Sequence, residues 1–130
     1  MSRLVLDSTV LIDALRGRPA ADRLRGLRRH GIEPWVCAIS IDEVWRGLHA
    51  DEEPIARRLI GALRHAPIGA AEAERSGRWR RDFAQRGVTL HQADCLIAAA
   101  AVGAGASLAT ANLADFPMPE LDLQHWPVGD

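Results

Sequence analysis

The hydrophobic and polar positions along this chain alternate between short apolar runs and stretches with helical spacing. Residues 4–6 form a continuous apolar run, which is typical of a central strand covered on both faces. Ser8 or Thr9 can cap a helix that follows this strand and ends near Gly17. Asp7 is left at the junction, where open parallel α/β sheets usually place their functional sites.

The rest of the chain repeats this order of strand and helix. Apolar runs predict strands at 35–39 and 107–110, with weaker ones at 66–68 and 121–123. Helical spacing and capping residues predict a helix from Pro19 to Gly31, one capped by Ser40, and others over residues 53–64, 70–86 and 91–102. We therefore expect an α/β fold with a central, mostly parallel sheet of about four to five strands.

Size and composition narrow the classes of protein. A length of 130 residues fits one domain that spans residues 1–130. The formal charge of −1 neither favours nor excludes a nucleic-acid partner. All 16 basic residues are arginine, so a catalytic lysine amine is excluded, whereas planar guanidinium groups suited to phosphate are plentiful.

Three features predict where the protein works. Cys37 and Cys95 lack metal-binding spacing, so we expect both side chains to pack in the core. Free cysteines are typical of a reducing compartment, so we expect a cytoplasmic protein. Residues 95–114 carry no charge, but glycines and polar residues divide them into helix, turn and strand. We therefore expect no membrane span there. The short apolar run before Asp7 does not resemble a signal peptide.

Four acidic residues are expected at the sheet edge where the first strand ends. A helix that follows a parallel strand runs back across the sheet, so its first turn lies at the same edge as the end of the strand. This geometry brings together Asp7, Glu43, Asp94 and Asp115. Asp94 is the only charge on an otherwise apolar helix, so it requires a cationic partner, which histidine, arginine or a metal could provide.

Each acid taken alone has a structural alternative. Glu43 follows Ser40 by three positions and Asp115 follows Asn112 by three, so both match patterns that support a helix start. Taken together, however, two carboxylates about 4 Å apart repel by roughly 4 kcal/mol at an effective dielectric near 20. Either some of them protonate or a cation joins them, and ligands that are all oxygen favour Mg²⁺ or Mn²⁺. Such an ion suits phosphodiester hydrolysis.

Four segments carrying these acids resemble a PIN domain, and more narrowly the VapC-type toxins of bacterial toxin–antitoxin pairs. The segments are residues 6–13, 40–44, 94–99 and 110–116. The resemblance implies a three-layer α/β/α sandwich and Mg²⁺- or Mn²⁺-dependent endonucleolytic cleavage of RNA. It also implies a homodimer and a cognate antitoxin whose C-terminal segment blocks the active site.

Carried over by position, the resemblance makes the four acids the metal-site residues. Our hypothesis is that Asp7, Asp94 and Asp115 hold the metal directly, whereas Glu43 binds it through water or orients the nucleophile. The auxiliary polar positions of the family match three further residues, Ser8, Thr110 and Asn112.

Several arginines are candidates for contact with RNA phosphates, although a solvated surface is the alternative for each. The candidates are Arg16, Arg18, Arg46, Arg78 and Arg81. Three rival functions stay open beside the RNA nuclease. They are a PIN-like scaffold that binds RNA or protein without catalysis, a metal-dependent nuclease acting on DNA, and a phosphoryl-transfer protein that uses Asp7. The last is disfavoured because such proteins also use a lysine.

Overall fold

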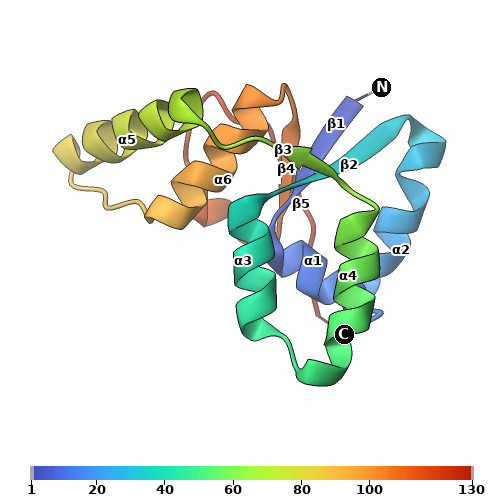
Figure 1. Cartoon of the computed structure of the whole chain (residues 1–130). Helices are drawn as coiled ribbons and strands as arrows, with labels where there is room; N and C mark the ends of the chain where they lie inside the picture. Colours follow the sequence, from blue (N-terminus) through green and yellow to red (C-terminus); the bar gives the residue numbers. More distant parts are fainter. Residues whose placement is uncertain (1, 130) are drawn as a thin grey trace.

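The computed structural model describes residues 2–129, which form a five-stranded sheet with the order β3-β2-β1-β4-β5 (Figure 1). All four strand pairings are parallel. The strands are β1 Ser2–Leu6, β2 Ile32–Cys37, β3 Arg64–Ala66, β4 Ser107–Thr110 and β5 Leu123–His125. The predicted parallel sheet is confirmed, with β1 at its centre and the carboxyl ends of all strands at one edge.

Helices cover both faces of this sheet (Figure 1). Their bounds are α1 Ser8–Leu15, α2 Pro19–Gly26, α3 Ala38–Gly47, α4 Glu53–Gly61, α5 Ala70–Gln85 and α6 Gln92–Gly103. Short 3₁₀ turns are η1 Arg28–His30, η2 Ala50–Glu52 and η3 Leu113–Asp115. The predicted three-layer α/β/α arrangement is therefore confirmed.

Side chains of the central strand alternate between two hydrophobic cores. Leu4 and Leu6 pack in the core beneath α1, α2, α3 and α4, whereas Val5 packs in the core beneath α5 and α6. Six residues of α6 are buried, which agrees with its continuous apolar sequence. Among the helices of residues 2–129, none combines the length and the apolar character that a membrane crossing requires.

Two helix caps differ from the predictions. Asp7, rather than Ser8 or Thr9, is the N-cap of α1, because its carboxylate accepts a hydrogen bond from the backbone N–H of Ser8. The prediction that Ser40 caps a helix is also wrong. Helix α3 already begins at Ala38, so Ser40 lies inside it, fully buried, with its hydroxyl 3.6 Å from the sulfur of Cys37.

Several strands also begin or end at residues other than those predicted. The strand predicted at 35–39 ends at Cys37, where α3 takes over. The predicted strand at 66–68 lies two residues earlier, because Pro67 has no N–H to donate to a sheet. The strand predicted at 121–123 begins only at Leu123. These shifts leave the carboxyl-end edge of the sheet as predicted.

Candidate active site

Asp7 is the most firmly held acid at this edge. It follows β1 directly and is only 5% exposed. Its Oδ1 accepts a hydrogen bond from the backbone N–H of Ser8 at 2.8 Å, while its Oδ2 accepts one from the hydroxyl of Thr110 at 2.8 Å. The hydroxyl of Thr9 also donates to Oδ2, at 3.1 Å. Three donors from two neighbouring segments therefore fix the orientation of this carboxylate.

Glu43 reaches the same place from α3. The hydroxyl of Ser8 donates to Glu43 Oε1 at 3.0 Å and lies 3.5 Å from Asp7 Oδ1. Glu43 does not complete a capping box with Ser40, because Ser40 is not a cap. Its carboxylate instead faces the first turn of α1, so the structural alternative for Glu43 is removed.

Asp94 lies in the first turn of α6 and is partly buried. Its pKa is raised to about 6, mainly because burial disfavours the charged form. The negative charges of Asp115, Asp7 and Glu43 raise this pKa further, and His91 opposes them. Each of the other three acids is therefore close enough for its charge to act on Asp94, which agrees with the predicted convergence.

Among residues 2–129, no arginine or histidine forms an ion pair with any of the four acids. The inferred cationic partner of Asp94 is thus not a side chain at ion-pair distance. An all-oxygen donor set of this kind fits a hard divalent cation such as Mg²⁺. In the described part of the chain, no three His, Cys, Asp or Glu side chains are yet arranged as metal ligands. A metal held by these acids would need side-chain positions other than those in this structure.

The auxiliary polar residues divide into two groups. Thr110 is fully buried and contacts Asp7 directly, as described above. Asn112 contributes through its backbone N–H, which donates to the hydroxyl of Thr110 at 3.0 Å. The role of Thr9 was missed in the sequence, although its place two residues after Asp7 was a signal. Its hydroxyl also accepts a hydrogen bond from the backbone N–H of Ala111, at 3.4 Å.

The five candidate arginines differ in whether they form an ion pair. Three form exposed ion pairs, Arg16 with Glu52 at 2.9 Å, Arg78 with Glu74 at 3.1 Å and Arg81 with Asp82 at 3.3 Å. The other two, Arg18 and Arg46, are exposed and form no ion pair within the described chain. Their guanidinium groups need no competing contact to be broken before they bind a phosphate.

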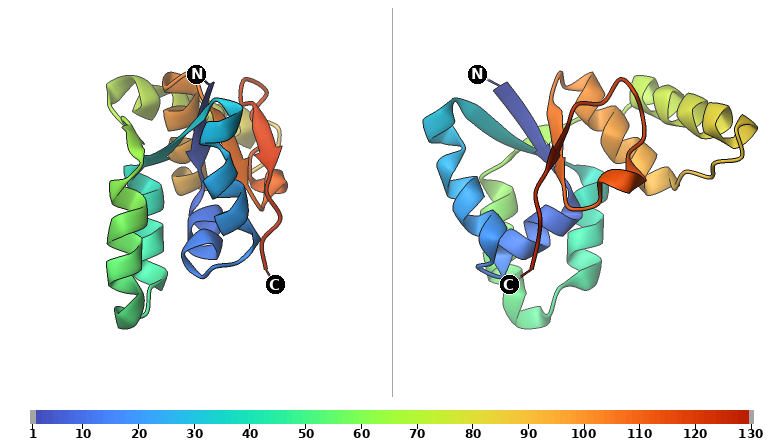
Figure 2. Two further views of the ribbon diagram at one scale, coloured as in Figure 1. Left: turned by 90° about the vertical axis from the view of Figure 1, so that its right-hand side faces the viewer. Right: turned by 180° about the vertical axis from the view of Figure 1, so that it is seen from behind.

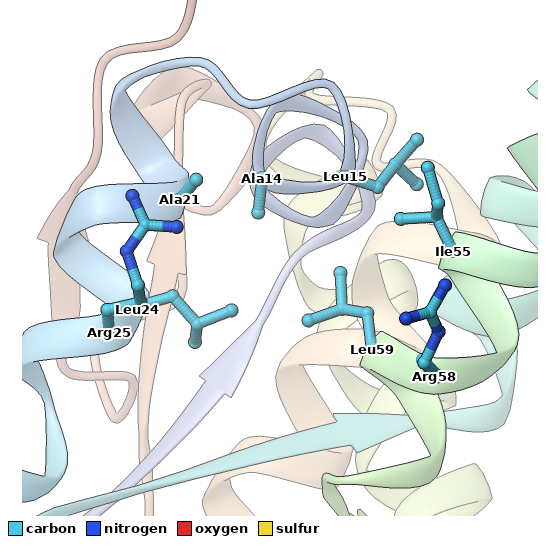
Figure 3. Close-up of a pocket in the computed structure, with 8 residues that line it drawn as sticks. All are labelled: Ala14, Leu15, Ala21, Leu24, Arg25, Ile55, Arg58 and Leu59. Atoms are coloured by element: carbon cyan, nitrogen blue, oxygen red, sulfur yellow. The ribbon is translucent and has the colours of Figure 1, made fainter.

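A second surface feature is an apolar groove of about 390 Å³ between α1, α2 and α4 (Figure 3). It is lined by Ala14, Leu15, Ala21, Leu24, Arg25, Ile55, Arg58 and Leu59. A neighbouring hollow of about 320 Å³ shares Leu24, Arg25 and Leu59 and extends the groove toward Leu63. Ile55 is 45% exposed there, so the groove presents apolar surface to solvent.

Comparisons with known proteins agree with this fold and site. The family model of the PIN domain matches residues 4–116. Ribonuclease VapC10 of Mycobacterium tuberculosis is 34% identical over 118 residues, which cover 90% of this chain and 88% of that protein.

Two solved structures are also similar. VapBC2 from Rickettsia felis, bound to a DNA fragment from its promoter, aligns with a TM-score of 0.84 at 21% identity, over 95% of this chain and 98% of that one. A toxin–antitoxin complex from Klebsiella pneumoniae aligns with a TM-score of 0.69 at 25% identity, over 91% and 94%. Matches of this extent in sequence and fold make the chain a member of the PIN domain family, with a VapC ribonuclease among its relatives.

Proposed function

We propose that this protein is a metal-dependent endoribonuclease and the toxin of a toxin–antitoxin pair. The observation that carries the proposal is the gathering of four acids at one sheet edge without a protein cation among the described residues. The similarity to a VapC ribonuclease supports it. Residues 1–130 work as one PIN-like domain, as a homodimer in the cytoplasm.

The metal in this proposal is Mg²⁺ or Mn²⁺, held by Asp7, Asp94 and Asp115. When bound, it activates a water molecule and neutralises the charge that develops on the phosphate. Thr9 and Thr110 keep the carboxylate of Asp7 in one orientation, which reduces the rearrangement that binding requires.

Glu43 has a different role, because the hydroxyl of Ser8 already occupies one of its oxygens. The other oxygen of Glu43 would help to hold the metal or would orient the attacking water. Ser8 is then a positioning residue between Glu43 and Asp7.

The substrate phosphates are proposed to contact the arginines named above. Arg18 and Arg46 are the first candidates, since their guanidinium groups form no ion pair within residues 2–129. Arg16, Arg78 and Arg81 can also contribute, because an exposed ion pair is worth only about 0.2–1 kcal/mol and can be exchanged for a phosphate contact.

Metal removal tests the proposal. We expect the purified protein to cut total bacterial RNA into discrete fragments with Mg²⁺ or Mn²⁺, and to leave it intact with excess EDTA. Saturating Mg²⁺, at 100 times its Kd, should raise the free energy of unfolding by about 2.7 kcal/mol. Cutting that persists in EDTA contradicts the metal site. Equal cutting of single-stranded DNA of the same sequence favours the DNA nuclease, and RNA binding without cutting favours the scaffold.

The groove in Figure 3 is proposed to seat a segment of the antitoxin. Its apolar lining suits a helix with leucine-like side chains, and Arg25 and Arg58 at its rim suit acidic flanks. Helix α1 connects the groove with the acids, because its first turn follows Asp7 and its last turn carries Leu15. Its eight residues span about 12 Å, so a segment leaving the groove along α1 soon reaches the acid site.

A charge in the groove should weaken this complex. We expect Leu59→Asp to lower antitoxin affinity by roughly 30- to 1,000-fold, the range for an apolar residue at the centre of an interface. The effect arises because the carboxylate loses water without gaining a partner. Titration calorimetry with the antitoxin measures it, and Leu59→Met, which keeps the apolar volume, is the control. Unchanged affinity for Leu59→Asp would place the antitoxin elsewhere.

A further inference from the structure

A small pocket adjoins the acid site on the side of α1. Its volume is about 210 Å³, and it is lined by Thr9, Ile12, Asp13, Arg18 and Val128. The hydroxyl of Thr9 donates to Oδ2 of Asp7 at 3.1 Å, so one wall of the pocket directly contacts the proposed metal site. A group bound there therefore lies beside Thr9, the residue that contacts Asp7.

The C-terminal tail supplies the opposite wall of this pocket, and it is fixed in place. It passes beside α1 and the start of α2 (Figure 2). The backbone N–H of Trp126 donates to the carbonyl of Thr110 at 2.9 Å, and Arg23 donates to the carbonyl of Pro127 at 3.1 Å. The backbone N–H of Gly129 donates to Oδ1 of Asp13 at 2.9 Å. Val128 is thus held between two anchored residues.

The two charges of the pocket are not equivalent. Asp13 is 2% exposed, and its second oxygen, Oδ2, accepts the backbone N–H of Ala20 at 2.9 Å. Both of its oxygens are therefore already used by backbone donors. Arg18 is exposed and begins α2 as its N-cap residue. The charge that the pocket offers to a ligand is the guanidinium, beside the apolar side chains of Ile12 and Val128.

We propose that this pocket binds the RNA nucleotide next to the scissile bond, with Arg18 on its phosphate. Ile12 and Val128 pack against its sugar or base. This inference rests on the proposed nuclease function and deepens it. Sites that enclose a drug-sized ligand take roughly 300–1,000 Å³, so about 210 Å³ suits the sugar or base of one nucleotide rather than a longer stretch of RNA.

Binding of a fluorescently labelled, single-stranded 12-nucleotide RNA tests the pocket, in an Asp94→Asn background with Mg²⁺ so that cleavage is slow during the measurement. We expect Arg18→Gln to weaken binding roughly tenfold, as the loss of one charge-assisted hydrogen bond does. The slope of log affinity against log salt should fall by about 0.7, the value for one phosphate contact on a single strand. Val128→Asp should weaken binding similarly, because its carboxylate repels the phosphate.

A matched control is Arg29→Gln, which removes the same charge from η1, before β2 and at the opposite edge of the sheet. It should bind the RNA like the parent. In the cleaving protein, the loss caused by Arg18→Gln should fall in KM rather than in kcat, and Arg18→Lys should restore part of it. A merely structural role for Arg18 would not change the salt slope.

The outcomes separate this inference from the nuclease proposal. If Arg18→Gln leaves affinity and salt slope unchanged, the pocket does not bind RNA. If only Arg18→Gln has an effect and Val128→Asp has none, the arginine acts outside the pocket and the inference is overturned. A parent protein that never cuts RNA, yet binds it in a way that depends on both residues, refutes the nuclease and supports the pocket. Absence of RNA binding by the Asp94→Asn protein refutes the pocket, whereas cleavage by the parent protein decides the nuclease separately.

Discussion

Replacing Asp94 with asparagine is expected to lower kcat for RNA cleavage by at least about 10²- to 10³-fold, the range for loss of a preorganised electrostatic group. Asparagine has nearly the same shape but no charge to hold a divalent ion. Asp94 makes no side-chain hydrogen bond or ion pair within residues 2–129, so the fold should be unaffected. Single-turnover cleavage and circular dichroism measure the two effects, with Asp51→Asn as an exposed control.

The same substitution should stabilise the protein without metal at pH 8. Burial and the neighbouring acids raise the pKa of Asp94 from 3.8 to about 6, so the folded state binds this proton more tightly than the unfolded state. The wild-type protein therefore loses stability as pH rises from about 4 to about 6. Asp94→Asn escapes this loss, which is on the order of 1 kcal/mol after solvent screening is allowed for. Urea unfolding at pH 4 and pH 8 tests it, and an equal response of both proteins to pH contradicts it.

Asp13→Ala should have the opposite effect and lower the free energy of unfolding by about 2–4 kcal/mol. The substitution leaves the backbone N–H groups of Ala20 and Gly129 without their acceptor, at about 1–3 kcal/mol for each buried group. For a chain of this size, we expect a drop in Tm of roughly 10 °C. Thermal and urea unfolding measure the loss, and hydrogen exchange should show a loosened C-terminal tail.

Two control substitutions accompany Asp13→Ala. Asp13→Asn keeps one side-chain oxygen as an acceptor, so its loss should be about half as large. Asp22→Ala removes an exposed acid from α2 and should change stability by less than about 0.5 kcal/mol. A loss below that value for Asp13→Ala would show that the tail does not depend on this carboxylate. Together, the two sets of variants distinguish the proposed metal-site role of Asp94 from the structural role of Asp13.

The sheet and the convergence of the acids were predictable because they follow from strong, repeated patterns. The apolar run at residues 4–6 is typical of a strand buried on both faces, and the apolar run of α6 is typical of a buried helix. Once strands and helices alternate, each helix runs back antiparallel to the strand before it, so its first turn lies at the edge where that strand ends. The topology of the sheet, rather than any single motif, therefore predicted the positions of Asp7, Glu43 and Asp94.

The capping prediction failed for a physical reason. A serine three residues before a glutamate matches a capping pattern, but the pattern does not say whether the serine side chain is buried. Here Ser40 packs beside Cys37 inside α3, and Glu43 is free to meet Ser8. Tertiary packing, rather than the local capping preference of serine, therefore determines the position of Ser40.

The structural role of Asp13 was invisible for another reason. Its two partners, Ala20 and Gly129, lie 7 and 116 residues away in the chain. No periodicity or spacing rule connects an acid with backbone N–H groups at such separations. The pocket beside Thr9 was hidden in the same way, because the tail that forms its wall is brought there only by long-range folding.

The hydrogen bond between Thr110 and Asp7 has a consequence for synthesis of the protein. It joins residues 103 positions apart, and β4 must insert beside β1 before it can form. A growing chain emerges from the ribosome with its N-terminus first, so β1 and β2 can pair long before β4 is available. The acid cluster is completed late, because Asp115 follows β4. The proposed metal site would therefore be incomplete until most of the chain has been made.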